Sequence, residues 1–136
     1  MIVADASLMT AWLLNETEVV ASEDVYDMLA DDTLLVPAHW PVEIGSALAV
    51  NLRRGRITAV LLDAIEERLQ KFVIEVQPAV QPSEIGALVS FASAQNLTAY
   101  DACYVQLAWQ NRAPLATLDG HMRAAAKKLN INLLPA

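Results

Sequence analysis

The stretch MIVADASLMTAWLL (residues 1–14) places a carboxylate where a strand runs into a helix. Met1–Ala4 is a short apolar run typical of a buried strand, and the pattern turns helical over 6–14. Asp5 or Ser7 is placed to cap that helix, because short polar side chains accept hydrogen bonds from first-turn amides. The stretch therefore predicts a βα junction with an acid at the turn.

The same alternation continues along the chain. Apolar runs predict further strands at 33–36, 72–76, 115–118 and 131–134. Capped or amphipathic stretches predict helices at 23–30, 41–54, 58–71, 83–94, 98–110 and 120–129, the first with Val25, Met28 and Leu29 facing inward. Strands alternating with helices indicate an α/β domain with a mostly parallel sheet, and continuous apolar strands indicate a sheet covered on both faces.

Composition bounds the class of protein. A chain of 136 residues with 55% hydrophobic and 18% charged side chains has the size and apolar content of a single domain, 1–136. The single cysteine, Cys103, excludes a disulfide framework and a cysteine-based zinc site, and we expect it to be a small buried hydrophobe. The formal net charge of −7 argues against a protein that coats nucleic acid.

No targeting or membrane segment is expected. The N-terminal stretch has no basic region, and Asp5 interrupts its apolar run. The longest uncharged run, Ile85–Tyr100, contains five polar side chains and falls short of the roughly 20 apolar residues of a spanning helix. We therefore expect a soluble, cytoplasmic protein.

Acidic residues are concentrated early in the chain. Residues 1–52 contain no Lys or Arg, and a solvated acidic face is the simplest interpretation of most of their acids. Asp5 and Glu43 do not fit it, because both have apolar neighbours. The nine acids are Asp5, Glu16, Glu18, Glu23, Asp24, Asp27, Asp31, Asp32 and Glu43.

Asp5 and Asp119 each follow a predicted strand. Ligands of parallel α/β sheets bind beyond the carboxyl ends of the strands, so we expect both carboxylates at that edge. The plainer alternative is that each is a helix N-cap. Glu43 lies on an apolar helix where burial of an unpaired charge is costly, with His39 as the one neighbour able to pair with it. Asp101 has capping-box spacing from a threonine, yet shares a face with apolar residues.

Together, the four acids Asp5, Glu43, Asp101 and Asp119 indicate a functional site more strongly than any one of them does alone. Crowded carboxylates repel one another, and a hard divalent cation resolves the repulsion. Oxygen-only ligands favour Mg²⁺ or Mn²⁺, which suits phosphate ester chemistry. Two hydroxyls, of Ser7 and Thr117, are placed to support the site, or are structural. Lone histidines such as His39 and His121 are more often structural than catalytic, and no nucleotide-binding glycine motif is present.

Four segments together resemble the PIN-domain ribonucleases, and within them the VapC-type toxins of bacterial toxin–antitoxin pairs. They are IVADAS, PAHWPVEIGSAL followed by LRRGRIT, LTAYDACYVQLA, and PLATLDGHMRAAAKKLNINLL. The resemblance covers nearly the whole chain in order. It implies a three-layer α/β/α sandwich with a short, mostly parallel sheet and an acidic pocket that binds Mg²⁺ or Mn²⁺.

The resemblance also implies roles for individual residues. The family's acids match Asp5, Glu43, Asp101 and Asp119, its hydroxyl residue before the last acid matches Thr117, and its small polar residue matches Ser7. The implied activity is metal-dependent hydrolysis of RNA, and the implied partners are RNA, a VapB-type antitoxin and a second copy of the chain. Trp40 and Pro41 depart from the pattern by making the loop before Glu43 stiff and bulky.

Positive charge for RNA falls in two clusters. Arg53, Arg54 and Arg56 follow the Glu43 helix, and a second cluster comprises Arg112, Arg123, Lys127 and Lys128. Charge that complements a helix C-terminus explains either cluster equally well.

Two other functions stay open. The first is a non-catalytic binding module on the same fold, with Trp12 and the apolar residues of 23–30 forming a groove or a homodimer face, if they are not core. The second is a phosphoreceiver-like α/β domain, although the late strands offer no lysine.

Overall fold

A computed structural model describes residues 1–15 and 23–136. Glu16 and Glu18, two of the early acids, lie outside the described residues. Seven α-helices, one 3-10 helix and five strands are present in the described part of the chain. In order they are β1 (Ile2–Ala4), α1 (Ala6–Leu13), α2 (Glu23–Ala30), β2 (Thr33–Val36), α3 (Trp40–Arg53), α4 (Ala59–Leu69), β3 (Val73–Val76), η1 (Pro82–Glu84), α5 (Ile85–Gln95), α6 (Ala99–Asn111), β4 (Leu115–Ala116), α7 (Gly120–Lys128) and β5 (Leu133–Leu134).

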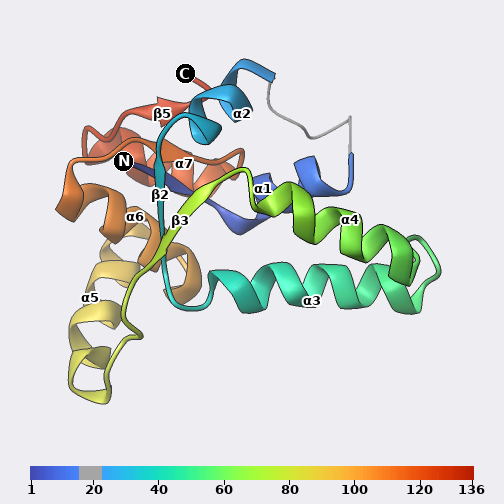
Figure 1. Ribbon diagram of the computed structural model, residues 1–136. Helices are drawn as coiled ribbons and strands as arrows, with labels where there is room; N and C mark the ends of the chain where they lie inside the picture. The colour runs from blue at the N-terminus through green and yellow to red at the C-terminus, as the bar shows by residue number, and fades with distance from the viewer. Residues whose placement is uncertain (16–22) are drawn as a thin grey trace.

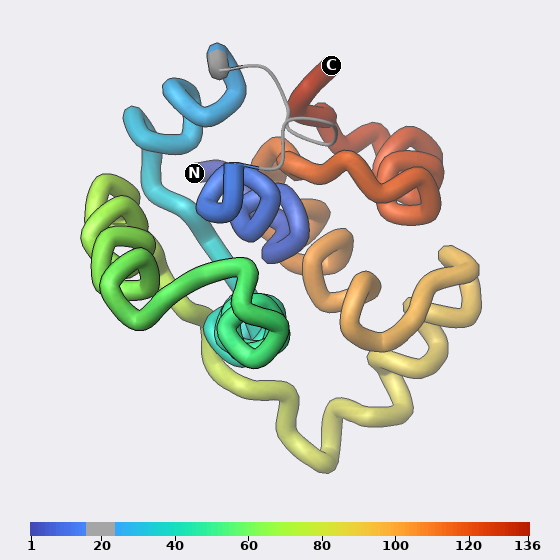
Figure 2. Tube along the Cα trace, turned by 90° about the vertical axis from the view of Figure 1, so that its right-hand side faces the viewer, coloured from blue at the N-terminus to red at the C-terminus, as the bar shows by residue number. Residues whose placement is uncertain are grey.

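The strands form one sheet in the order β3-β2-β1-β4-β5, and every neighbouring pair is parallel. The chain moves from β1 outward through β2 to β3, then crosses to β4 on the other side of β1 and continues to β5. Because crossovers between parallel strands are right-handed, this reversal puts α1–α4 on one face and α5–α7 on the other. Figure 2 shows these two groups of helices on opposite sides of the fold. The expected α/β/α sandwich is confirmed.

Helix boundaries follow the capping residues. Asp5 caps α1, Thr58 caps α4, and Thr98 caps α6, each through its side-chain oxygen. Gly55, just beyond α3, has a φ of 69°, a conformation that glycine adopts without steric cost. In Figure 1, α3 extends away from the sheet, so its two ends lie in very different surroundings.

The core lies around β1, β2 and β4. Val3, Leu34 and Leu115 are completely inaccessible to solvent. Strand β3 is different, because it is an edge strand, and its Val73 and Val76 are exposed. The expectation of a sheet with every strand covered is therefore wrong at this edge. The strands β4 and β5 are also shorter than the apolar runs that predict them.

Helix α2 packs against β2, and its inner face differs by one residue from the face that the sequence predicts. Val25 and Leu29 are buried as expected, but Met28 is 47% exposed. Tyr26 is buried instead, and its hydroxyl donates to the Leu8 carbonyl of α1 at 3.0 Å. Asp24, Asp27 and Asp31 are exposed, which confirms a solvated acidic face for these three acids.

Trp12 belongs to the margin of the core. Its ring stacks on Tyr26 with centroids 5.5 Å apart and meets the edge of Phe72 at 5.3 Å. The Arg68 guanidinium lies 4.4 Å from the Trp12 ring centroid and donates to the Leu13 carbonyl. These contacts join α1 to α4 and α2, so core packing accounts for Trp12. No helix in the described ranges has the length and apolar run needed to cross a bilayer.

Truncating the core at β2 is expected to destabilise the fold strongly. Leu34→Ala removes a side chain with no exposed surface and leaves a cavity, so we expect it to lower the free energy of unfolding by about 2–5 kcal/mol. Leu61→Ala, a matched change at a side chain that is 45% exposed, should cost at most about 0.5 kcal/mol. Urea denaturation measures both, and equal losses would contradict this account of the core.

Candidate functional site

The strands β1 and β4 end side by side where the direction of the chain through the sheet reverses. Ala4 pairs with Ala116, so the next residue of each strand, Asp5 and Thr117, also lie next to one another. The Asp5 amide donates to the Ala116 carbonyl at 3.0 Å, which carries the pairing one step beyond the strands. This reversal point is where open parallel sheets bind ligands.

Asp5 is only 3% exposed and is held by three donors. The Ser7 hydroxyl donates to Oδ2 at 2.6 Å, the Thr117 hydroxyl donates to the same oxygen at 2.9 Å, and the Ser7 amide donates to Oδ1 at 3.2 Å. Hydrogen bonds to an ionised carboxylate offset part of the cost of burying its charge. Both supporting roles expected from the sequence, for Ser7 and for Thr117, are therefore present as direct contacts.

Thr117 links Asp5 to the start of α7. Its side-chain oxygen accepts from the Asp119 amide at 3.0 Å while its proton goes to Asp5. Asp119 then caps α7, with Oδ1 accepting from the Met122 amide at 2.9 Å. Arg123, four residues after Asp119, donates to the Thr117 carbonyl at 2.9 Å. The sequence places Arg123 in a late basic cluster, and the first turn of α7 brings this residue to the carboxyl edge of the sheet.

Glu43 reaches the same edge from the first turn of α3. Its Oε1 accepts from the Tyr104 hydroxyl of α6 at 3.2 Å and lies 2.9 Å from His39 Nε2. Burial lowers the pKa of His39, so the imidazole is neutral at pH 7; its Nε2 is buried and lacks hydrogen-bond geometry in this contact. Burial, together with the charges of Asp5 and Asp101, raises the pKa of Glu43.

Asp101 occupies the first turn of α6, beside the capping Thr98. Burial raises the pKa of the Asp101 carboxyl, and the charges of Asp119 and Asp5 raise it further. His121, which is exposed on α7, lowers the pKa of Asp101. Asp101 and Glu43 are both partly buried and both repelled by neighbouring acids. The structure therefore brings the four expected acids into one electrostatically coupled group, from the β1–α1 junction, α3, α6 and the β4–α7 junction.

The chemistry of this group fits a hard divalent cation, because its donors are carboxylate oxygens whose mutual repulsion a cation would relieve. Their spacing is open, however. Within residues 1–15 and 23–136, no three Asp, Glu, His or Cys side chains form a group that could hold an ion as they stand. A cation here requires rotation of the side chains of Glu43, Asp101 or Asp119, all of which are partly exposed.

The arginines that follow the Glu43 helix lie away from this edge. Arg53, Arg54 and Arg56 are exposed at the far end of α3. Arg53 is ten residues beyond Glu43, which corresponds to about 15 Å along a helix axis.

Cys103 is half-buried rather than fully buried, and burial with the nearby Glu43 charge raises the pKa of its thiol.

Tyr104 is the site residue that sequence reasoning missed. It is 1% exposed, and burial raises the pKa of its hydroxyl well above its ordinary value, so it stays protonated as a donor to Glu43. Its apolar neighbours on α6 made it indistinguishable from a core residue. Its position three residues after Asp101, on the same helix face, is the one available signal.

Comparison with known proteins supports the fold. The chain is similar to PAE2754 from Pyrobaculum aerophilum, known from a crystal structure, with a TM-score of 0.70 and 22% sequence identity. The match covers 98% of this chain and 83% of that one. No protein-family model and no curated protein sequence matches the chain.

Thr117→Val is expected to destabilise the fold although it nearly preserves side-chain shape. It removes the donor to buried Asp5 and the acceptor of the Asp119 amide. An unsatisfied buried group costs about 1–3 kcal/mol, so we expect a loss of that size in urea denaturation. Thr10→Val, on the partly exposed side of α1, is the control. Equal stability of the two variants would show that the Thr117 hydroxyl is dispensable.

Asp101→Asn should stabilise the metal-free protein at neutral pH. A carboxyl whose pKa is raised on folding destabilises the fold when ionised, and this penalty disappears as the pH falls through the folded-state pKa toward the unfolded value of 3.8. The advantage of Asp101→Asn should therefore shrink between pH 7 and pH 4, in urea titrations with chelator. Asp27→Asn, at an exposed acid of α2, is the control. A variant less stable than wild type at pH 7 would contradict the repulsion.

Proposed function

We propose that this protein is a PIN-domain ribonuclease of the VapC toxin type, a metal-dependent endoribonuclease that hydrolyses RNA. The observation that carries the proposal is the coupled group of Asp5, Glu43, Asp101 and Asp119 at the reversal point of a parallel sheet. The order and spacing of the four sequence segments add the family resemblance.

Asp5, Asp101 and Asp119 would hold Mg²⁺ or Mn²⁺, with Glu43 as a further ligand or as the base. The ion supplies water activation and neutralises charge on the phosphate oxygens. Asp5 is the fixed member of the set, because Ser7 and Thr117 hold both of its oxygens in place. Binding of an ion would require the other three acids to adjust around it.

Glu43 is the group best suited to take a proton from the attacking water. Its raised pKa makes it a better proton acceptor than an unperturbed carboxylate, and the Tyr104 hydroxyl orients it. The water oxygen would bond to phosphorus as the ester P–O bond breaks, Glu43 would take the water proton, and the leaving oxygen would take up a proton from bulk water. Tyr104 is a positioning residue in this scheme, because it acts through Glu43.

The proposed biological setting follows the resemblance. RNA is the substrate, a VapB-type antitoxin and a second copy of the chain are the protein partners, and the cytoplasm is the compartment. Arg53, Arg54 and Arg56 would contact RNA backbone at a distance from the cleaved bond, since they lie at the far end of α3.

One observation favours a different function. Among the described residues, the four carboxylates do not converge on one point. This open arrangement is the one expected of a non-catalytic binding module on the same fold. Metal binding without RNA cleavage would support that alternative.

Hydrolysis of RNA with and without Mn²⁺ tests the nuclease proposal. We expect cleavage by the wild type only with the ion, and for Asp5→Asn a loss at least as large as the roughly tenfold to hundredfold cost of losing an outer-shell partner of a metal. Asp27→Asn, an exposed acid of α2, is the matched control and should cleave normally. Equal cleavage by wild type and Asp5→Asn in both conditions would contradict the proposal.

Replacing Arg53, Arg54 and Arg56 together by alanine should weaken RNA binding and flatten its salt dependence. Three lost phosphate contacts to single-stranded RNA lower the slope of log K against log salt by about 2. Fluorescence anisotropy at several salt concentrations measures the slope. Lys71→Ala, at an exposed residue just after α4, should leave it unchanged. An unaltered slope in the triple variant would assign these arginines to helix termination alone.

A further inference from the structure

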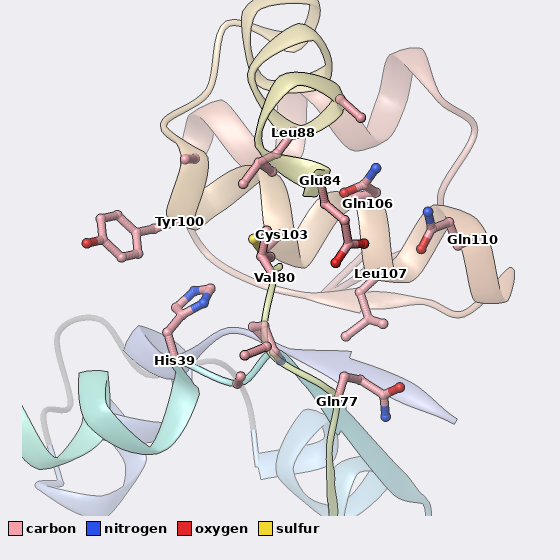
Figure 3. Close-up of a pocket in the computed structure, with 15 residues that line it drawn as sticks. His39, Gln77, Val80, Glu84, Leu88, Tyr100, Cys103, Gln106, Leu107 and Gln110 are labelled. Atoms are coloured by element: carbon pink, nitrogen blue, oxygen red, sulfur yellow. The ribbon is translucent and has the colours of Figure 1, made fainter. Parts of the chain in front are cut away.

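A cavity of about 440 Å³ lies beside the acidic group, between helices α5 and α6 and the segment that joins β3 to η1. Its volume is within the range of small-molecule sites. Figure 3 shows His39 on one side of the cavity and Gln110 of α6 on the other, with Cys103 and the Glu84 carboxylate between them and Gln106 beside Glu84. The proposed hydrolysis assigns no task to this cavity.

The cavity and the acidic group share a wall. His39 lines the cavity, and its Nε2 lies 2.9 Å from Glu43 Oε1. Tyr100 and Cys103 also line it, and they stand on either side of Asp101 along α6. The His39 ring meets the Tyr100 ring edge-on, with centroids 5.4 Å apart. A group bound in the cavity therefore lies one side chain away from the carboxylates.

The lining selects for an uncharged ligand that donates hydrogen bonds. None of the described residues that line the cavity is Lys or Arg, so it is a poor place for a phosphate. Glu84 offers a carboxylate that also accepts from the Gln81 amide at 2.9 Å, and the amides of Gln106 and Gln110 can donate or accept. Tyr100 and His39 add aromatic rings, against which unpaired bases commonly stack.

We propose that this cavity is a base-recognition subsite, which holds one unpaired base of RNA next to the cleaved phosphodiester and prefers a base with an exocyclic amino group. The Glu84 carboxylate accepts from that amino group, which cytosine, adenine and guanine carry and uracil lacks. This inference rests on the proposed function for its link to cleavage, but the binding of a base is a separate property.

Cytidine and uridine are the probes for the subsite, because their bases differ mainly in an amino group or an oxygen at one ring position. NMR titration of the metal-free protein should show cytidine shifting the amides of Cys103 and Gln106, with uridine roughly tenfold weaker. In Glu84→Gln, the ratio of cytidine affinity to uridine affinity should fall to near unity. The substitution keeps the cap of η1, because Gln serves in a capping box as well as Glu.

Ala87→Phe fills the cavity from α5 and should abolish the cytidine shifts. Ala94→Phe is the matched control, because Ala94 is exposed on the same helix and does not line the cavity. With Mn²⁺ and mixed-sequence ribo-oligonucleotides, the wild type should cleave next to bases that carry an amino group. Glu84→Gln should lose that preference, and Ala94→Phe should keep it.

The outcomes separate the two proposals. Cleavage with no cytidine shifts and an unchanged product pattern in Glu84→Gln and Ala87→Phe would overturn the subsite and leave the nuclease standing. Cytidine binding that Glu84→Gln weakens, without any cleavage by the wild type, would uphold a base site and overturn the nuclease. If Ala87→Phe alters the oligomeric state while neither nucleoside shifts any lining amide, the cavity belongs to an interface between copies and the subsite is wrong.

Discussion

The hydrogen bond from the Thr117 hydroxyl to Asp5 is the contact on which the carboxyl edge of the sheet depends. It joins β1 to β4 at the point where the chain reverses its path through the sheet, just beyond the Ala4–Ala116 pair. The same threonine oxygen receives the Asp119 amide, so the start of α7 is set by the contact that holds Asp5. A buried carboxylate without such donors would cost several kcal/mol, and the short β4 has few ladder bonds to compensate for it.

Around this fixed point the protein leaves negative charge unbalanced. Glu43 and Asp101 arrive on the first turns of two helices from opposite faces of the sheet, where the helix dipoles favour acids. Burial and the charges of neighbouring acids nevertheless raise the pKa of both carboxyls. Such a group lowers the free energy of unfolding at neutral pH, and a bound cation would restore the lost stability. Because the acids are openly spaced, stabilisation by a cation would depend on side-chain movement.

The sequence predicted what local patterns determine. The strand–helix order, the caps at Asp5 and Thr58, and the acids at strand and helix ends all depend on near neighbours, and the structure has them. Features set by tertiary packing were not predictable. Tyr26 replaces Met28 in the core because its hydroxyl reaches a carbonyl on another helix.

The site shows the same division. Cys103 is half-buried because a cavity opens where α5 and the segment after β3 diverge, and no periodicity encodes that gap. Arg123 turns toward Thr117 through the first turn of α7, which a count of basic residues does not reveal. We propose that the four acids act as one cation site anchored on Asp5. Calorimetric titration of the metal-free protein with Mn²⁺ at pH 7 tests it most directly. The account predicts saturable binding by the wild type and binding at least about tenfold weaker in Asp5→Asn. Equal affinity of the two proteins, or no binding by the wild type, would contradict it.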